Sequence, residues 1–231
     1  KFKLLRRQGM TGISAQDDWI REEIEGRGIT QICHFTRVKA LRSIKEHGIR
    51  SSRYLQSKNI PFTQNDESRS EGLDMNTCYS VQFPNVRVLK AFIRRHETNP
   101  EDWVILLINP EILYDKFASI KFCATNAAFE NGEHLKYGKE GFNAMFADQV
   151  TTREGPKRRN ESFHPYSTTD LQAEILLNRK VTWDQIKSAI FFSESQSMKM
   201  NQIDPTKRVL SHRDSFDLQY IKMKRLKQSY R

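Results

Sequence analysis

The chain has 231 residues, enough for one domain with a sizeable hydrophobic core. Charged residues make up 29% and hydrophobic residues 37%, and no apolar run reaches the roughly 18 to 20 residues that a membrane span needs. The first residues are basic but lack the apolar segment of a secretory signal. The composition argues against an integral membrane protein, and we expect a cytoplasmic one.

Three cysteines are present, at positions 33, 78 and 123, and none forms a C-x-x-C pair. Each stands in an apolar stretch, so we interpret them as reduced core residues rather than as metal ligands or nucleophiles. We expect no metal site.

The net charge of +10 lies at the two ends of the chain. Residues 1–10 carry +4 and residues 207–231 carry +6, while the residues between them balance to zero. A loop predicted at 150–162 nevertheless holds a basic cluster, composed of Arg153, Lys157, Arg158 and Arg159. Such a cluster beside a reactive centre suits a polyanion, although a solvated loop explains the charge equally well.

The first half of the chain predicts a helix, a strand and a second helix. A capping-box pattern at 14–17 and apolar spacing up to residue 26 indicate a short amphipathic helix. Residues 31–35 read as a buried strand, with Thr36 at the N-cap of a helix that ends at Gly48. The following 50–77 region is polar and predicts a long loop, which is typical of a binding loop or a lid.

The second half predicts mostly strands. Residues 103–108 are continuously apolar, so this strand should be central and buried on both faces. Short strands mixed with short helices, without a regular βαβ rhythm, predict an α+β fold. The other predicted elements are strands at 78–83, 116–122, 171–177 and 186–192, and helices at 85–95 and 141–147.

Glu174 is the unusual residue of the 171–177 strand. Alternation places it on one face with Gln172 and Leu176, within an otherwise apolar segment. A carboxylate there is either paired or catalytic, unless this is an edge strand with Glu174 on its wet face. Phosphate-binding loops, dinucleotide Rossmann turns and zincin motifs are absent from the sequence. His34, Tyr79 and Glu174, each on a different predicted strand, remain to be explained.

The order strand-His, strand-Tyr, strand-Glu resembles the arrangement of ADP-ribosyltransferases. Six short motifs in this order are similar to the DarT family of bacterial toxins: ICHFT at 32–36, the helix end at Gly48, YSVQFPN at 79–85, WVILLINP at 103–110, NAA at 126–128 and QAEIL at 172–176. The resemblance covers residues 29–195. It implies an ADP-ribosyltransferase fold with mixed central sheets, and an enzyme that moves ADP-ribose from NAD+ onto a base of single-stranded DNA.

The resemblance also implies roles for individual residues. Glu174 would be catalytic and Arg69 would assist it, while NAD+ would be held by His34, Thr36, Tyr79 and Asn126. Nucleic acid would be bound by the basic cluster of 153–159 together with Thr169 and Gln172. The family is paired with an antitoxin that carries a macrodomain, which would then be a partner.

Two alternatives to this function stay open at this point. The same NAD+ chemistry on RNA would keep the site and change the acceptor. A catalytically silent nucleic-acid-binding module would keep only the scaffold. We divide the chain into a basic N-terminal segment with a helix (1–28), the transferase domain (29–195), and a basic extension (196–231) that packs on the same domain or continues it.

Overall fold

The protein is described by a computed structural model, which defines residues 19–63, 74–115 and 119–227. One sheet of eight strands runs through the molecule in the order β10-β9-β3-β1-β2-β8-β4-β5, and β6 and β7 form a separate hairpin. Every pair in the large sheet is antiparallel except β10 with β9. The strands are β1 (Ile32–Arg37), β2 (Thr77–Val81), β3 (Trp103–Ile108), β4 (Ile120–Cys123), β5 (Leu135–Lys136), β6 (Gln149–Thr152), β7 (Gly155–Arg158), β8 (Glu174–Leu177), β9 (Ile186–Phe191) and β10 (Arg208–Ser211).

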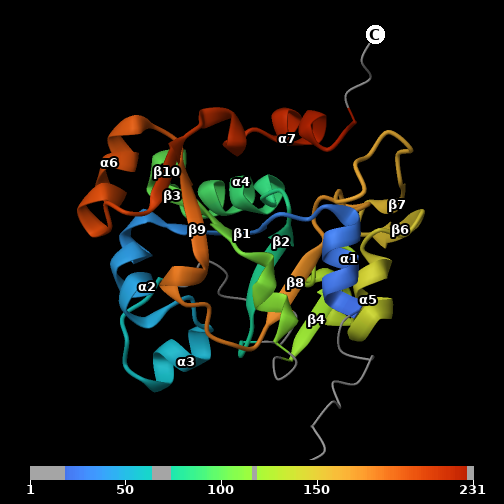
Figure 1. The fold of residues 1–231 in the computed structure, drawn as a ribbon, viewed down its shortest axis with the longest axis horizontal. Coiled ribbons are helices and arrows are strands. Elements are labelled where there is room, and N and C mark those ends of the chain that lie inside the picture. Colours follow the sequence, from blue (N-terminus) through green and yellow to red (C-terminus); the bar gives the residue numbers. More distant parts are fainter. Residues whose placement is uncertain (1–18, 64–73, 116–118, 228–231) are drawn as a thin grey trace, which may run out of the picture.

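Helices cover both faces of this sheet. In the view of Figure 1, α4 and α7 lie above it, α2 and α3 lie below it, and α1 and α5 stand beside β4. The sheet and its helices form the α+β architecture predicted from the sequence. The helices are α1 (Trp19–Arg27), α2 (Leu41–His47), α3 (Ser52–Ser57), α4 (Val86–Arg95), α5 (Gly138–Ala144), α6 (Glu194–Ile203) and α7 (Leu218–Lys224).

The sheet is split near its middle. β1 pairs with β2 only at Ile32 and Cys33, whereas all six residues of β1 pair with β3. From His34 onward, β1 therefore follows β3 and separates from β2. The gap leaves backbone and side chains of two central strands accessible to a ligand.

Two of the three hydrophobic clusters in the described core are large, and they lie on opposite faces of the sheet. The larger one contains the side chains of Ile32, Tyr79 and Ile175 and packs against α1, α2 and α5. The smaller one contains Cys33 and Leu89 and lies under α4. Because neighbours along a strand point to opposite faces, the alternation read from the sequence separates these clusters correctly.

Several predicted elements need correction. Thr36 is not a helix N-cap: β1 continues through it because Val104 and Trp103 of β3 extend the pairing, and a 3-10 turn at Val38–Ala40 follows. The 50–77 region contains α3, capped by the Ser51 hydroxyl, which accepts from the Tyr54 N–H at 3.3 Å. The predicted loop at 150–162 is mainly the β6–β7 hairpin, since Gly155 (φ 99°) supplies the left-handed turn.

The other predicted elements agree with the structure within a few residues. β3 matches residues 103–108, is fully buried and lies between β1 and β9, as a central strand should. α4 begins after Asn85 as expected. The capping pattern at 14–17 and the start of the 116–122 strand lie outside the described residues.

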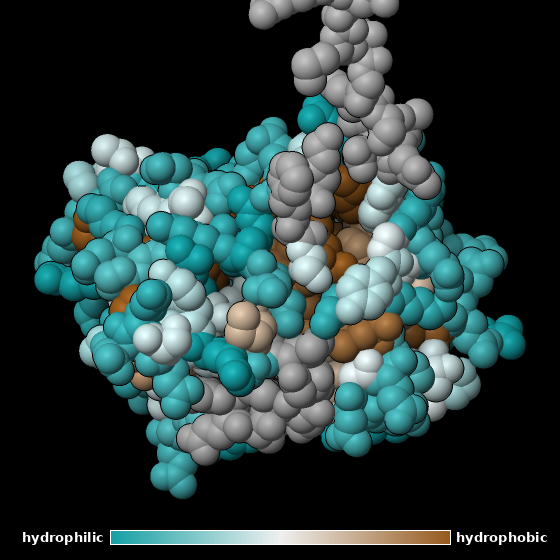
Figure 2. All heavy atoms as spheres, turned by 90° about the horizontal axis from the view of Figure 1, so that it is seen from below, coloured by the Kyte–Doolittle hydropathy of each residue, from teal (hydrophilic) through white to brown (hydrophobic). Residues whose placement is uncertain are grey.

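The surface is largely hydrophilic. Figure 2, which views the molecule from below, shows hydrophobic side chains gathered mainly right of the centre of a mostly hydrophilic face. Among the described helices, none has the length and apolar character to cross a bilayer.

Candidate functional site

A cavity of about 770 Å³ lies at the split between β1 and β2. This size falls in the range of small-molecule and cofactor sites. Its walls come from β1, β2, α2, α3, α4, the 125–129 turn, the tip of the β6–β7 hairpin and the start of β8. Lining residues that enter the argument below are His34, Thr36, Tyr79, Ser80, Asn85, Arg87, Asn126, Arg153, Glu154, Gln172 and Glu174.

Glu174 begins β8 and is 9% exposed. Its Oε2 accepts the backbone N–H of Ala127 at 2.9 Å, which fixes one oxygen of the carboxylate. Glu174 is paired with Cys123 of β4, and extending the pairing of Tyr79 with Ile175 places Ser80 on its other side. The wet edge-strand alternative is excluded, because β8 lies between β2 and β4.

The carboxylate lies on the α4 face of the sheet. Directly opposed residues of an antiparallel pair share a face, and Ser80 is paired with Cys33, whose side chain packs under α4. Burial and the nearby carboxylates of Glu174 and Asp170 raise the pKa of the Cys123 thiol to about 11. Cys123 is therefore an inert core residue, as the sequence indicated.

The turn that supports Glu174 is itself braced. Asn126 Oδ1 accepts the Ala128 N–H at 3.1 Å and shapes this turn. The buried carboxylate of Asp170 accepts from the Thr125 hydroxyl at 2.7 Å and from Lys157 Nζ at 2.9 Å. The loop before β8, the 125–128 turn and the hairpin are thus tied together around one carboxylate.

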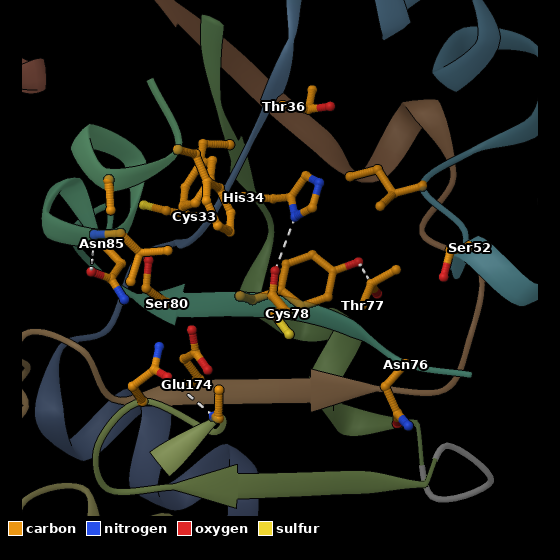
Figure 3. A pocket seen from close by; sticks show the side chains of 18 of the residues that line it. Cys33, His34, Thr36, Ser52, Asn76, Thr77, Cys78, Ser80, Asn85 and Glu174 are labelled. Carbon is orange, nitrogen blue, oxygen red and sulfur yellow. Dashed lines mark hydrogen bonds between the residues drawn. The ribbon is translucent and has the colours of Figure 1, made fainter. Parts of the chain in front are cut away.

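His34 approaches the cavity from the opposite face. Its Nδ1 donates to the Cys78 carbonyl at 2.9 Å, so in the neutral ring Nε2 carries the free lone pair. Burial lowers the pKa of His34, and the bond to Cys78 only partly opposes this. The ring lies 5.3 Å from that of Tyr79. Figure 3 shows His34 on one side of β2 and Glu174 on the other.

Tyr79 and Thr36 are more buried than a ligand platform would be. Tyr79 is 2% exposed, and its hydroxyl oxygen accepts from the Thr77 hydroxyl at 2.8 Å. Burial raises the pKa of this phenol, so the ring is neutral. Thr36 is 8% exposed and borders the cavity from β1. Tyr79 therefore packs against His34 and contributes little exposed surface to the cavity that it lines.

The candidate nucleic-acid residues fall into two groups. Arg153 and Arg158 are exposed on the hairpin, and Arg153 and Gln172 line the cavity. The remaining three serve the interior: Lys157 pairs with Asp170; Arg159 donates to the Ser167 carbonyl at 2.6 Å; and Thr169, 4% exposed, donates to the Ala147 carbonyl at 2.6 Å. The sequence alone did not distinguish the exposed residues from the buried ones, because the partners of residues 159–172 are distant in the sequence. Arg69 lies outside the described residues.

Two residues of the site were not among the sequence-based candidates. Arg87 of α4 forms two hydrogen bonds with the Glu154 carboxylate at the hairpin tip, one of them 2.8 Å long. Asn85 caps α4 and faces the cavity. The Pro84–Asn85 helix start is visible in the sequence, but by itself it indicates only a helix cap.

This arrangement defines a class of protein. A buried carboxylate and a neutral histidine reach one cavity from opposite faces of a split sheet, which suits a nucleotide donor whose ribose is attacked. Residues 33–217 match the family model described as ssDNA thymidine ADP-ribosyltransferase, DarT. The chain therefore belongs to the DarT family, and the family and fold predicted from the sequence are confirmed.

Solved structures show the same fold. Thermosipho africanus DarTG in complex with ADP-ribose is 13% identical with a TM-score of 0.59, over 81% of this chain and 51% of that one. The chain thus spans about half the length of that DarTG chain. Thermus sp. 2.9 DarT is similar in complex with ADP-ribosylated ssDNA (15%, TM-score 0.57, 81% and 96% covered) and with NAD+ (14%, 0.55, 80% and 96%). No curated protein matches in sequence.

Proposed function

We propose that this chain transfers ADP-ribose from NAD+ to a thymine base of single-stranded DNA, the reaction by which its family is described. The observation that carries the proposal is Glu174, a buried carboxylate fixed by the Ala127 N–H at the wall of a cavity large enough for a dinucleotide. This agrees with the enzyme class and the co-substrate predicted from the sequence.

The reaction breaks the bond between nicotinamide N1 and C1 of the adjoining ribose, and nicotinamide leaves with the electron pair. Thymine N3 loses its proton and forms the new bond to that carbon. Glu174 stabilises the positive charge that develops on the ribose, and its carboxylate accepts the proton from N3. His34, neutral with a free Nε2 lone pair, accepts a hydrogen bond from a hydroxyl of NAD+.

The remaining cavity residues hold the substrates. Thr36 and Asn126 contact NAD+ from β1 and from the 125–128 turn, and Arg69 assists Glu174 as the family resemblance implies. Arg153 and Arg158 hold DNA phosphates on the exposed side of the hairpin, beside Gln172 at the cavity wall. A base must leave its stack to enter such a cavity, which favours a single strand.

The transferase domain of this proposal runs beyond residue 195. β10 pairs with β9 in the large sheet, which supports a domain that includes residues 196–227 together with 29–195. As partner we propose an antitoxin with a macrodomain, as the family resemblance implies.

The test uses the full chain with labelled NAD+ and four acceptors: single-stranded oligonucleotides with and without thymidine, duplex DNA, and RNA. We expect label only on the single strand that contains thymidine, and nuclease digestion should yield ADP-ribosylated thymidine. Label on RNA would transfer the proposal to an RNA acceptor, and the absence of label from every pool would refute it.

A further inference from the structure

Asn85 carries an amide nitrogen that has no hydrogen-bond acceptor in the described part of the chain. The residue is 3% exposed and precedes α4, where its Oδ1 accepts the Val88 N–H at 3.2 Å. The cap thus uses the oxygen and leaves Nδ2 unused. Because a buried donor without an acceptor is costly, a ligand that supplies an acceptor oxygen would remove that cost.

The position of Asn85 identifies the side of the cavity that it serves. β2 runs from Thr77 to Val81, and Asn85 follows the end at which Ser80 lies beside Glu174. Figure 3 shows Asn85, Ser80 and Glu174 toward one side, with Asn76 and Ser52 toward the other. Leu89 of α4 clusters with Cys33, so Asn85, the N-cap of α4, lines the cavity on the α4 face, which is also the face of the Glu174 carboxylate.

The electrostatics at this point favour an oxygen that gains negative charge. α4 has ten residues, and its first turn presents the positive end of the helix dipole. Arg87, two residues further on, also lines the cavity, but its guanidinium is paired with the Glu154 carboxylate and adds little net charge. An amide donor beside this positive end selects a carbonyl oxygen on which charge develops.

We propose that Asn85 recognises the target thymine by donating a hydrogen bond from Nδ2 to its O2 or O4. The inference rests on the function proposed above. In a thymine nucleotide N3 is the only ring nitrogen with a hydrogen, and its loss spreads negative charge over O2 and O4. Asn85 and the start of α4 stabilise this charge while N3 attacks. Cytosine carries an amine donor in place of O4, so a contact at O4 also rejects cytosine.

Asn85→Asp is the main variant, because aspartate caps a helix as well as asparagine does. The change replaces the Nδ2 donor with an acceptor oxygen and adds a negative charge to the cavity that Glu174 also lines. We expect kcat/KM for a thymidine-containing single strand to fall about 10- to 100-fold. NAD+ affinity, measured by calorimetry, should stay within about twofold. The control is Asn109→Asp, the same change at a cap outside the cavity lining, where Nδ2 donates to the Glu111 carboxylate at 2.9 Å. The folded variant should transfer ADP-ribose at the wild-type rate.

A second measurement replaces O2 or O4 of the target base with sulfur, a weak acceptor. The wild type should be slower with one of the two thio-substrates than with normal thymidine. Asn85→Asp should transfer to that thio-substrate as fast as it does to normal thymidine, because the contact is already lost. The inference would be overturned if Asn85→Asp transferred ADP-ribose normally, or if it lost NAD+ affinity as strongly as it lost transfer. It would also be overturned if the wild type were fully active on both thio-substrates, or if the losses from the variant and from the sulfur substitution added up. Failure of the wild type to modify any thymidine would instead refute the proposed function.

Discussion

At the scale of single residues, Glu174 carries the proposed chemistry. An isosteric substitution removes its charge while keeping its shape, so it tests the charge alone. Glu174→Gln keeps an oxygen for the Ala127 N–H. We expect transfer to fall about 10²- to 10³-fold, as when one preorganised charge stabiliser is removed. The melting temperature should hold or rise, since a buried charge is lost. Glu161→Gln, an exposed control, should behave as wild type. A folded Glu174→Gln variant with unimpaired transfer would contradict the role.

His34 makes stability depend on pH in a definite direction. Burial lowers the pKa of His34 below its ordinary value of 6.5. Just below pH 6.5 this residue therefore binds a proton in the unfolded chain but not in the native state. The free energy of unfolding should therefore fall as the pH drops from about 6.5 toward the native pKa, and be unaffected by this group above 6.5. Urea denaturation between pH 5 and 7.5 measures the slope. His34→Gln should flatten it, and an unchanged slope would show that the ring is not held neutral.

At the scale of elements, the β6–β7 hairpin combines two kinds of basic residue. Arg153 and Arg158 are exposed, whereas Lys157 neutralises Asp170, which is 1% exposed. Arg153→Gln and Arg158→Gln should each weaken single-strand binding and reduce the salt slope by about 0.7, with the fold intact.

Lys157→Met is the internal comparison for that element. We expect it to lower the free energy of unfolding by about 2 kcal/mol, since it leaves a buried carboxylate without its cation. DNA affinity at a temperature where the variant is folded should change little. If the salt dependence of DNA binding fell strongly while stability stayed unaltered, Lys157 would be a phosphate-binding residue instead.

At the scale of the whole molecule, the segment after α7 braces the loop that leads to Glu174. Arg225 is 5% exposed and donates to the carbonyls of Thr168 and Thr169, while its own carbonyl accepts from the Ser167 hydroxyl at 3.0 Å. Burial lowers its pKa to about 10, so the guanidinium is charged at neutral pH. Arg225 lies beyond residue 217, at which the match to the family model ends.

Arg225→Met should therefore slow DNA transfer more than it weakens NAD+ binding. The variant leaves two buried carbonyls without a donor, a cost of about 2 kcal/mol. Added guanidinium, which refills the space, should restore part of the transfer rate. Arg213→Met, at an exposed position over Phe192, is the control. Equal losses in NAD+ binding and transfer, without rescue, would reduce Arg225 to a general stability role.

The sequence by itself determined much of the local structure and singled out the central carboxylate. Continuous apolarity predicted β3, period-two alternation placed Glu174 on the face opposite Ile175, and helical spacing after Asn85 predicted α4. These patterns are local, because side-chain periodicity records which side of an element is buried. The motif order around His34 and Glu174 then indicated the family.

Only the tertiary structure decided how these elements meet. Periodicity does not say which strands pair, so the separation of β1 from β2 after Cys33 and the cavity that it opens were not readable from the chain. The same holds for Lys157, whose charge looked free until Asp170 was placed beside it, and for Asn85, whose unused amide appears only once its neighbours are known. A side chain's function here depends on partners distant in sequence, and only folding brings them together.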